Sequence, residues 1–340
     1  MTATELAHAF RRHGPNGPDA TLPLWVSRAA GVCLFDADGS RYLDFSSGAV
    51  APLGHNHPDI YGALAIAGHR IAVPGSEWVE TAELMQLLAE VVPGGTNRRV
   101  LVMDSGREAL ARAVGLAQQI TSRQRVVYLA DMTTAEVSLP ADCAGLVANP
   151  FDARLPAARA ACDGTGALLI DDETGIGPGL TGTMLAIEQT PVRADCHVLG
   201  RGWAAGLGFG ACVTGSSSMH WDGQPAANPL GCVAALATVR LLKAGLVQQG
   251  IEASAHLEQG LRLLARSRVP CAFSGEGLVW TMLVPGGKAQ AFVARARKRG
   301  LLLLELGPDA VGIRPPLVVS RSEIEGALAV IGAVVAEAKA

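Results

Sequence analysis

Short apolar runs that alternate with stretches of helical periodicity restrict the fold of this chain more than any other feature. Six such runs in the middle of the sequence are interpreted as buried strands, at residues 100–103, 126–130, 145–148, 167–170, 197–199 and 211–214. Strands that alternate with helices form mostly parallel sheets, because each crossover connection is itself a helix. The sequence therefore predicts an α/β fold with a doubly wound, mostly parallel sheet.

Helical patterns occupy stretches before, between and after these strands. They lie at residues 80–92, 107–120, 156–162 and 229–244. Asn228 stands directly before the last of them, where an asparagine side chain can cap the first turn. Together these strands and helices predict a large domain at residues 46–246.

The sequence after residue 250 has a different pattern. Helices are predicted at 253–266 and 289–299, strands at 278–284, 301–305 and 311–313, and a final helix from a capping box at Ser320 and Glu323 to about residue 338. A hairpin pattern at residues 32–45 is too short to fold alone. Residues 1–45 and 250–340 are therefore predicted to form a smaller α+β domain that includes the hairpin.

Charge and composition exclude several classes of protein. Lys plus Arg number 28 against 31 Asp plus Glu, and aromatic residues make up 4% of the chain. Nucleic-acid binding is not expected, since neither a basic stripe nor aromatic stacking residues stand out. No apolar stretch reaches the 18 residues of a membrane span, and the N-terminal residues lack the apolar core of a signal peptide.

The seven cysteines are odd in number, scattered, and form no Cys-x-x-Cys pair. This spacing argues against a disulfide framework and a zinc site, and it favours a reducing compartment. His55 and His57 have no acidic or thiol ligand nearby in sequence, so no metal site is predicted. We therefore expect a cytoplasmic protein that is not bound to a membrane.

Six segments, taken in order, resemble the class III aminotransferases, which are fold-type-I pyridoxal-phosphate (PLP) enzymes. These segments are "GVCLFDADGSRYLDFSSGAVAPLGHNHPDI" (31–60), "VVPGGTNRRVLVMDSGREALARAVGLA" (91–117), "LLIDDETGIGPGLTG" (168–182), "VLGRGWAAGLGFGACV" (198–213), "NPLGCVAALATV" (228–239) and "GIRPPLVVSRSEIEGAL" (312–328). The resemblance covers most of the chain. It implies the fold type of that family, and a homodimer with its sites at the subunit interface.

The resemblance also implies a set of site residues. Ser105 and Gly106 would begin a helix whose N-terminus receives the cofactor phosphate. Asp171 would pair with the pyridine nitrogen of the cofactor. Gln224 stands where the family has a threonine that reaches the phosphate from the partner subunit, and Arg314 stands where the family binds a substrate carboxylate.

The chain departs from the family pattern at several of these positions. Arg201 stands where the family has its Schiff-base lysine, and an arginine cannot form that imine. Only four lysines occur in the whole chain, and none is near this segment. Arg107 replaces a small residue of the phosphate turn. The aromatic segment expected after residues 126–128 has no equivalent, and the stretch between residues 130 and 167 is several dozen residues short.

Two interpretations of the altered cleft remain open. Arg201, Arg107 and Arg314 would bring three guanidinium groups to one cavity, where they need anionic partners or water. In one interpretation, Asp171 and Glu173 pair with them and the site is inactive. In the other, the arginines bind a carboxylate or phosphate ligand. Arg201 and Asp171 are then the candidate catalytic residues.

The favoured functional hypothesis is a degenerate family member that does not perform PLP-dependent transamination. It would be a PLP-independent enzyme or a binding protein for a small anionic, amino-acid-like ligand. One alternative is a non-catalytic partner that forms a heterodimer with an active homologue. Another is a transaminase or dehydratase that uses non-covalent pyridoxamine phosphate or PLP. Whether this protein is an enzyme at all is left open by the sequence.

Overall fold

Two compact units make up the chain in the computed structural model, which describes residues 3–13, 24–70, 78–94, 97–215, 227–266, 272–284 and 286–337. The first unit comprises Met1–Ser47, Gly54–His57 and Ala253–Ala340, and the second comprises Gly48–Leu53 and Pro58–Glu252. The sequence-based division placed residues 54–57 with the sheet domain. They group with the first unit instead, because His55 and Gly31 exchange backbone hydrogen bonds of 2.8 and 2.9 Å.

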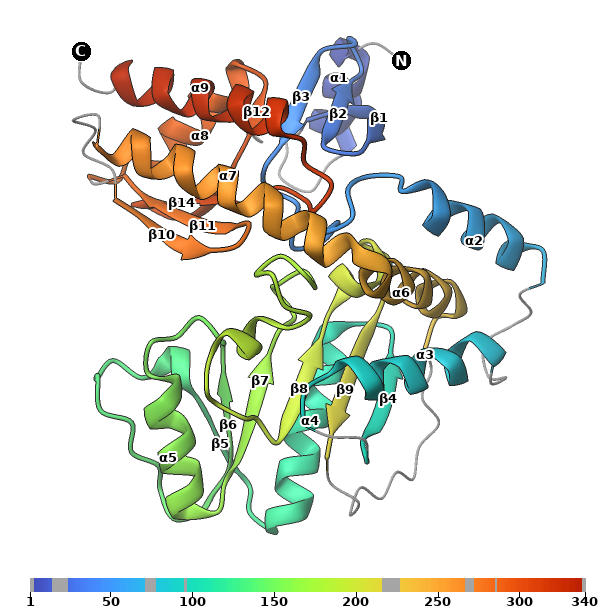
Figure 1. The fold of residues 1–340 in the computed structure, drawn as a ribbon, viewed down its shortest axis with the longest axis vertical. Coiled ribbons are helices and arrows are strands. Elements are labelled where there is room, and N and C mark those ends of the chain that lie inside the picture. The colour runs from blue at the N-terminus through green and yellow to red at the C-terminus, as the bar shows by residue number, and fades with distance from the viewer. Residues whose placement is uncertain are drawn as a thin grey trace. The chain divides into compact units, whose positions relative to one another are not determined.

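A six-stranded sheet with the order β4-β9-β8-β7-β6-β5 forms the centre of the second unit (Figure 1). Its strands are β4 (Arg99–Met103), β5 (Arg125–Tyr128), β6 (Cys143–Ala148), β7 (Leu168–Asp172), β8 (Cys196–Leu199) and β9 (Gly210–Thr214). Strands β5 to β8 are mutually parallel, whereas β9 is antiparallel to both β8 and β4. The predicted α/β fold with a mostly parallel sheet is confirmed.

Helix α4 (Gly106–Thr121) covers one face of this sheet through small side chains at Ala109, Ala113 and Ala117. The buried strand residues packed against it are Leu101, Met103, Val147, Ile170, Cys196, Val198 and Cys212. Side chains alternate between the two faces along a strand. The residues next to Ile170 and Cys196, which are Asp171 and His197, therefore point to the opposite face.

The other helices of the second unit are α2 (Pro58–Gly68), α3 (Val79–Val91), α5 (Leu155–Thr165) and α6 (Pro229–Leu241). Asn228 caps α6 as predicted, and its side-chain oxygen accepts the N–H of Leu230 at 2.9 Å. The stretch Pro229–Arg266 is long and apolar enough to cross a membrane, but half of its apolar window is buried inside the structure. Burial against α2 and α3 accounts for the apolar composition of α6.

The first unit contains two small sheets. One has the order β1-β2-β3-β12, with β1 (Val26–Ala30), β2 (Cys33–Asp36), β3 (Arg41–Asp44) and β12 (Leu301–Leu302). The other has the order β10-β11-β14-β13, with β10 (Ala272–Glu276), β11 (Val279–Leu283), β14 (Ala310–Ile313) and β13 (Leu304–Gly307). The predicted hairpin is β2–β3. Within this sheet it pairs with the C-terminal part of the chain through β12, which is parallel to β3.

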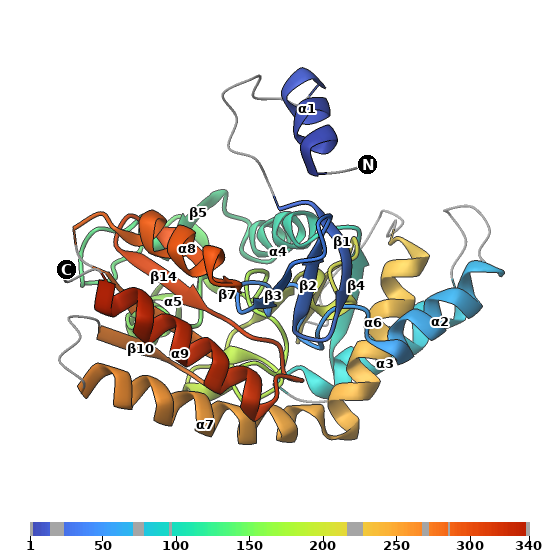
Figure 2. The ribbon, with the colours of Figure 1, turned by 90° about the horizontal axis from the view of Figure 1, so that it is seen from above.

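Helices α8 (Ala289–Lys298) and α9 (Arg321–Glu337), and α7 (Val247–Arg266) from Ala253 onward, belong to the first unit, as does α1 (Ala3–His13). Figure 2 shows α7 and α9 side by side. Their spacing is close, because a Cβ on Gly260 would stand 2.1 Å from Cδ1 of Leu328. The predicted capping box is present, since Glu323 accepts the N–H of Ser320 at 2.8 Å and donates its own N–H back.

Candidate functional site

A pocket of about 360 Å³ lies where β4 and β8 end and α4 begins. Its lining residues come from the turns after β4, β7 and β8: Asp104, Ser105, Gly106, Arg107, Thr174, Gly200, Arg201, Gly206, Leu207, Gly208 and Phe209. The structure thus brings together Ser105, Gly106, Arg107 and Arg201, as the sequence predicts. The carboxyl ends of strands are the usual place for ligands in α/β proteins. This cavity is called the arginine pocket below.

The N-terminus of α4 forms one wall of the arginine pocket. Ser105 is the N-cap, and its hydroxyl accepts the N–H of Glu108 at 3.2 Å. The turn passes so close to Thr174 that a Cβ on Gly106 would lie 2.8 Å from its Cγ2. The first amides of a helix have no intrahelical acceptor, and the helix dipole adds partial positive charge there. This wall therefore favours an anionic group.

Arg201 begins the short helix η4 (Arg201–Ala204), which follows β8 directly. The carbonyl of Arg201 accepts the N–H of Gly206 at 2.9 Å. Between them, Ala205 has a left-handed φ of 51°, which is uncommon for a residue with a Cβ. This tight turn fixes the backbone from which the Arg201 side chain extends.

Positive charge dominates the arginine pocket. Arg107 and Arg201 are exposed, and neither forms an ion pair with a carboxylate of the described residues. Asp104 is the acidic group in the lining, and its Oδ1 accepts the backbone N–H of Asn228. Two guanidinium groups and a helix N-terminus therefore face one carboxylate.

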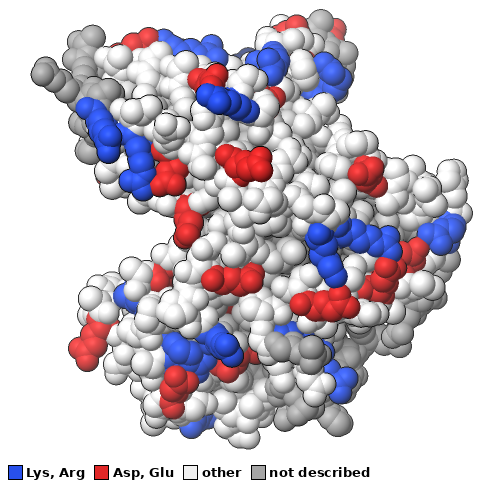
Figure 3. Space-filling model, in the orientation of Figure 1, with Lys and Arg blue, Asp and Glu red and all other residues white. Residues whose placement is uncertain are grey.

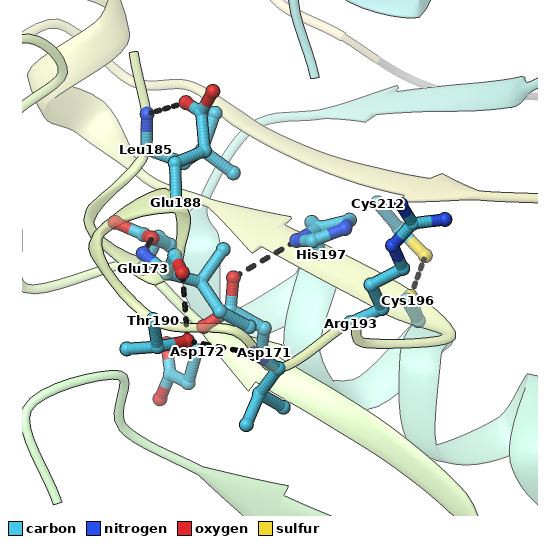
Figure 4. Close-up of polar contacts among 12 residues, drawn as sticks. Asp171, Asp172, Glu173, Leu185, Glu188, Thr190, Arg193, Cys196, His197 and Cys212 are labelled. Carbon is cyan, nitrogen blue, oxygen red and sulfur yellow. Dashed lines mark hydrogen bonds and ion pairs between the residues drawn. The ribbon is translucent and has the colours of Figure 1, made fainter. Parts of the chain in front are cut away.

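The interpretation in which Asp171 and Glu173 neutralise these arginines is wrong for the described structure. Asp171 Oδ2 lies 2.9 Å from His197 Nδ1, and both side chains are buried (Figure 4). Glu173 is buried as well, and its carboxylate accepts the N–H of Ile187 at 2.9 Å. Both carboxylates are thus engaged elsewhere, and the charges of the pocket remain available to a ligand.

Asp171 is not brought to the arginine pocket. It follows Ile170, which faces α4, so the alternation of β7 directs it to the opposite face. Asp172 lies on the α4 side instead. Its Oδ1 accepts the N–H of Thr174 at 3.0 Å and the hydroxyl of Thr174 at 2.6 Å, and Thr174 lines the pocket. The sequence prediction did not include Asp172. Two signals indicate it: the alternation of side chains along β7, and the Asp-Glu order at residues 172–173.

The family model described as "Aminotransferase class-III" matches residues 15–134 and 129–335. The chain belongs to the class III aminotransferase family. It is 27% identical over 412 residues to the 4-aminobutyrate aminotransferase GabT of Escherichia coli (strain K12), an alignment that covers 96% of each chain.

Solved structures of aminotransferases have the same fold as this class III chain. The acetylornithine aminotransferase of Elizabethkingia anophelis superposes with a TM-score of 0.84 at 19% identity, over 99% of each chain. An S-selective transaminase from Arthrobacter sp. superposes with a TM-score of 0.88 at 17% identity, over 100% of this chain and 99% of that one. The predicted fold type of class III aminotransferases is confirmed.

Two further residues named from the class III resemblance are not placed in the arginine pocket. Gln224 lies outside the described residues. Arg314 belongs to the first unit, where it follows β14 and its backbone N–H donates to the carbonyl of Phe45 at 2.6 Å. Their roles in this class III chain stay predictions. Among the described residues, no group of three or more His, Cys, Asp or Glu side chains is arranged to hold a metal ion.

Asp171 and His197 form a buried polar pair on neighbouring strands of the six-stranded sheet. Burial, together with a smaller contribution from the positive charge of Arg98, lowers the pKa of His197 to about 4. Burial also raises the pKa of Asp171, and the neighbouring charge of Asp172 adds to this effect. Burial therefore disfavours the charged form of both groups.

Proposed function

We propose that this class III aminotransferase homologue binds a small anionic, amino-acid-like ligand in the arginine pocket, without covalently bound PLP. The proposal depends on one observation. Arg107 and Arg201 line a single cavity at the N-terminus of α4, and neither is paired with a carboxylate of the described residues. Guanidinium groups hold carboxylates and phosphates through two parallel hydrogen bonds, and the helix amides add further donors.

The residues of the pocket do not fit covalently linked PLP. Arg201 stands where the resemblance implies a lysine, and a guanidinium stays protonated in proteins, so it cannot act as a nucleophilic amine. The described lysines, Lys243, Lys288 and Lys298, do not line the cavity. Among the described residues of the lining, Phe209 is the one with an aromatic ring, and it is buried.

The chain's own residues supply binding and orientation. Arg107 and Arg201 would hold one acidic group, and the amides at the start of α4 would hold a second. Asp104 offers a carboxylate to a ligand ammonium group, since only its Oδ1 is engaged by Asn228. This combination of charges supports an amino-acid-like ligand with at least one extra anionic group. Such a protein would be either a binding protein or a repurposed enzyme.

Calorimetric titration of the full-length protein with O-phosphoserine and with glutamate tests this proposal. Each of Arg107→Gln and Arg201→Gln is expected to weaken binding by roughly 10- to 100-fold, because each removes charge-assisted hydrogen bonds. Arg240→Gln is the matched control, since Arg240 pairs with Glu83 outside the pocket. An affinity that is unchanged in both pocket variants would contradict the proposal.

Absorbance spectra separate the alternatives. Purified protein and the Arg201→Lys variant are both expected to remain colourless after incubation with PLP and dialysis. A vitamin B6 band that survives dialysis of the unmodified protein would instead support use of non-covalent pyridoxamine phosphate. A co-purifying homologue that carries the missing lysine would support the partner-subunit alternative.

We further propose that the protein forms a homodimer through an apolar surface on α2, α3 and the start of α6. Ile66 is 67% exposed and Val79 is 81% exposed, and Tyr61 and Leu230 are exposed as well. Ala67, Trp78 and Pro229 line one small cavity, which shows that the three helix ends adjoin. A contiguous apolar surface of this kind is typical of an interface.

Ion pairs connect the helices that carry this apolar surface. Figure 3 shows basic and acidic side chains side by side over α3 and α6. The pairs that connect the helices and their ends are Arg70–Glu80, Arg240–Glu83 and Lys243–Glu90. The first pair connects the residue Arg70, just after α2, to α3, and the other two connect α3 to α6 and to the residues that follow it.

The substitution Val79→Asp tests the dimer proposal. Light scattering after size exclusion is expected to show a dimer for the unmodified protein and a monomer for this variant, because a buried unpaired carboxylate opposes association. Leu263→Asp on α7 is the control, since Leu263 is also exposed but lies outside this surface. A monomeric unmodified protein, or a Val79→Asp dimer of undiminished affinity, would exclude this surface as the interface.

A further inference from the structure

We infer that the second unit carries a separate binding site for a small organic carboxylate with an apolar body, at the amino ends of β4 and β8. A cavity of about 550 Å³ lies there. Its lining residues are Pro93, Gly94, Ile187, Glu188, Thr190, Pro191, Val192, Arg193, Ala194 and His197. Cavities of this size are typical of small-molecule sites. It is called the His197 cavity below.

The His197 cavity and the arginine pocket lie at opposite edges of the same sheet. Strands β4 and β8 are both antiparallel to β9, so they run parallel to each other. Pro93 and Gly94 precede β4, and residues 190–194 precede β8. The arginine pocket is built from the turns that follow these two strands. The two cavities have no lining residue in common, and a ligand in one does not occupy the other.

Two buried, unpaired nitrogen atoms of the half-buried Arg98 guanidinium point to an anionic ligand. The Nε and Nη1 atoms of Arg98 are buried and have no hydrogen-bond partner among the described residues. Its Nη2 lies 1.6 Å from the position that a Cβ on Gly94 would take, so the guanidinium packs directly against a residue of the cavity wall. Buried polar atoms are nearly always paired. An oxygen anion that enters beside Gly94 would supply the missing acceptors.

Nearby carboxylates are engaged elsewhere and do not neutralise Arg98. Asp195 pairs with Arg159 at 2.7 Å. Glu188 accepts the backbone N–H of Leu185 through Oε1 at 2.8 Å. Arg193, on the cavity wall, forms no ion pair with a described carboxylate. The cavity thus has one cationic side chain on its wall, Arg193, a second packed against Gly94, Arg98, and one wall carboxylate, Glu188.

His197 defines the end of the cavity that faces the sheet. Its Nδ1 bonds Asp171, so the orientation of the imidazole ring is fixed by a buried partner (Figure 4). The charged or titratable groups around it are Asp171, Asp172, Arg98, Glu188 and Asp195. Burial and Arg98 keep this histidine neutral at physiological pH. A neutral imidazole gives polar contact without adding a third cation.

The remaining walls are apolar and select the body of the ligand. They are formed by Pro93, Ile187, Pro191, Val192 and Ala194. A ligand that carries negative charge over its whole surface would place charged groups against these apolar walls, which is unfavourable. A carboxylate attached to a ring or a short alkyl chain places its charge near Arg98 and its apolar atoms on these walls.

Calorimetry with three probes tests this inference on the full-length protein: benzoate, its neutral isostere benzamide, and inorganic phosphate. We expect benzoate to bind at least tenfold more tightly than either of the others. Arg98→Met is expected to weaken benzoate binding at least tenfold, and Arg193→Gln to weaken it to a smaller extent. Arg107→Gln is the matched control and is expected to leave benzoate binding unchanged.

Thermal unfolding gives a second readout. Arg98→Met removes a half-buried charge whose Nε and Nη1 atoms are unpaired, so the ligand-free variant is expected to unfold at the same or a higher temperature than the unmodified protein. Benzoate is expected to raise the unfolding temperature of the unmodified protein but not of this variant. O-phosphoserine binding in the arginine pocket should be the same in both, which separates this inference from the proposed function.

Three results would overturn the inference. The first is the absence of benzoate binding at millimolar concentration. The second is binding that disappears in Arg107→Gln but persists in Arg98→Met, which would place benzoate in the arginine pocket. The third is equal binding of phosphate and benzoate, because the apolar walls would then contribute nothing.

Discussion

Gly210→Ala is expected to lower the free energy of unfolding by roughly 3 kcal/mol or more. This is the upper end of the usual cost of overpacking, because only movement of the backbone can relieve the clash. A Cβ on Gly210 would stand 2.1 Å from the carbonyl oxygen of Ser105 and 2.7 Å from the backbone nitrogen of Gly106. Both contacts are with backbone atoms, so no side chain can move aside. The start of β9 and the turn that begins α4 would have to separate.

Gly115→Ala is the matched control for this prediction. Gly115 lies within α4 and is exposed, and a Cβ there would meet nothing within 4 Å. Alanine has the higher helix propensity, so this variant is expected to gain about 0.5–1 kcal/mol. Denaturant titration of both variants should therefore give shifts of opposite sign. Two similar shifts would show that the close approach at Gly210 does not limit stability.

Binding measurements extend the same prediction to the arginine pocket. The atoms that a Gly210 side chain would displace belong to Ser105 and Gly106, which form the wall at the start of α4. We therefore expect Gly210→Ala to weaken O-phosphoserine binding as well. The wall of the pocket and the packing of the sheet depend on the same glycine.

The core of the second unit follows closely from local sequence. All six residues of β6 are buried, and a continuous apolar run is what a central parallel strand requires. The predicted helix at 80–92 corresponds to α3, Val79–Val91. Such elements are predictable because both faces of a strand, or one stripe of a helix, lie in the core and the sequence records this burial.

The first unit shows where local patterns fail. The run at residues 301–305 predicts one strand, but the chain leaves one sheet and enters another at Leu303. Leu301 pairs with Leu43, which is distant in sequence, whereas Leu304 pairs with Gly312. An apolar run indicates that a segment is partly buried, but not which sheet it joins. Tertiary packing, and not local sequence, determines which strands pair with each other.

The candidate site was predictable in part. Arg107 and Arg201 were named from the resemblance, and the structure places both in one pocket. The sequence predicts Asp171 as the site residue, whereas the structure places Asp172 on the side of α4. The two differ because neighbouring residues of a strand point to opposite faces of the sheet. The pairing of Asp171 with His197 joins two strands 26 residues apart, and no local pattern indicates it.

Asp44→Ala in the first unit is expected to lower the free energy of unfolding by about 3 kcal/mol, the lower end of the range for breaking a buried charged pair. Asp44 is 1% exposed and accepts hydrogen bonds from the backbone and hydroxyl of Ser46, from the hydroxyl of Ser47, and from His55 Nε2 at 2.8 Å. Alanine would leave these donors without an acceptor. Asp38→Ala, in the exposed hairpin turn, is the control and is expected to change stability by less than about 0.5 kcal/mol.

Acid titration of the unmodified protein and of Asp44→Ala distinguishes the ionised carboxylate from simple packing. Burial raises the pKa of Asp44, but the hydrogen bonds from His55, Ser46 and Ser47 outweigh burial and hold the pKa below the ordinary 3.8. A carboxyl group whose pKa is lower in the folded state stabilises the fold above its unfolded pKa. That stability is lost as pH falls through the folded value. The difference in the free energy of unfolding between the two proteins should therefore be constant near neutral pH and shrink below about pH 4. A difference that does not depend on pH would instead assign the effect to packing alone.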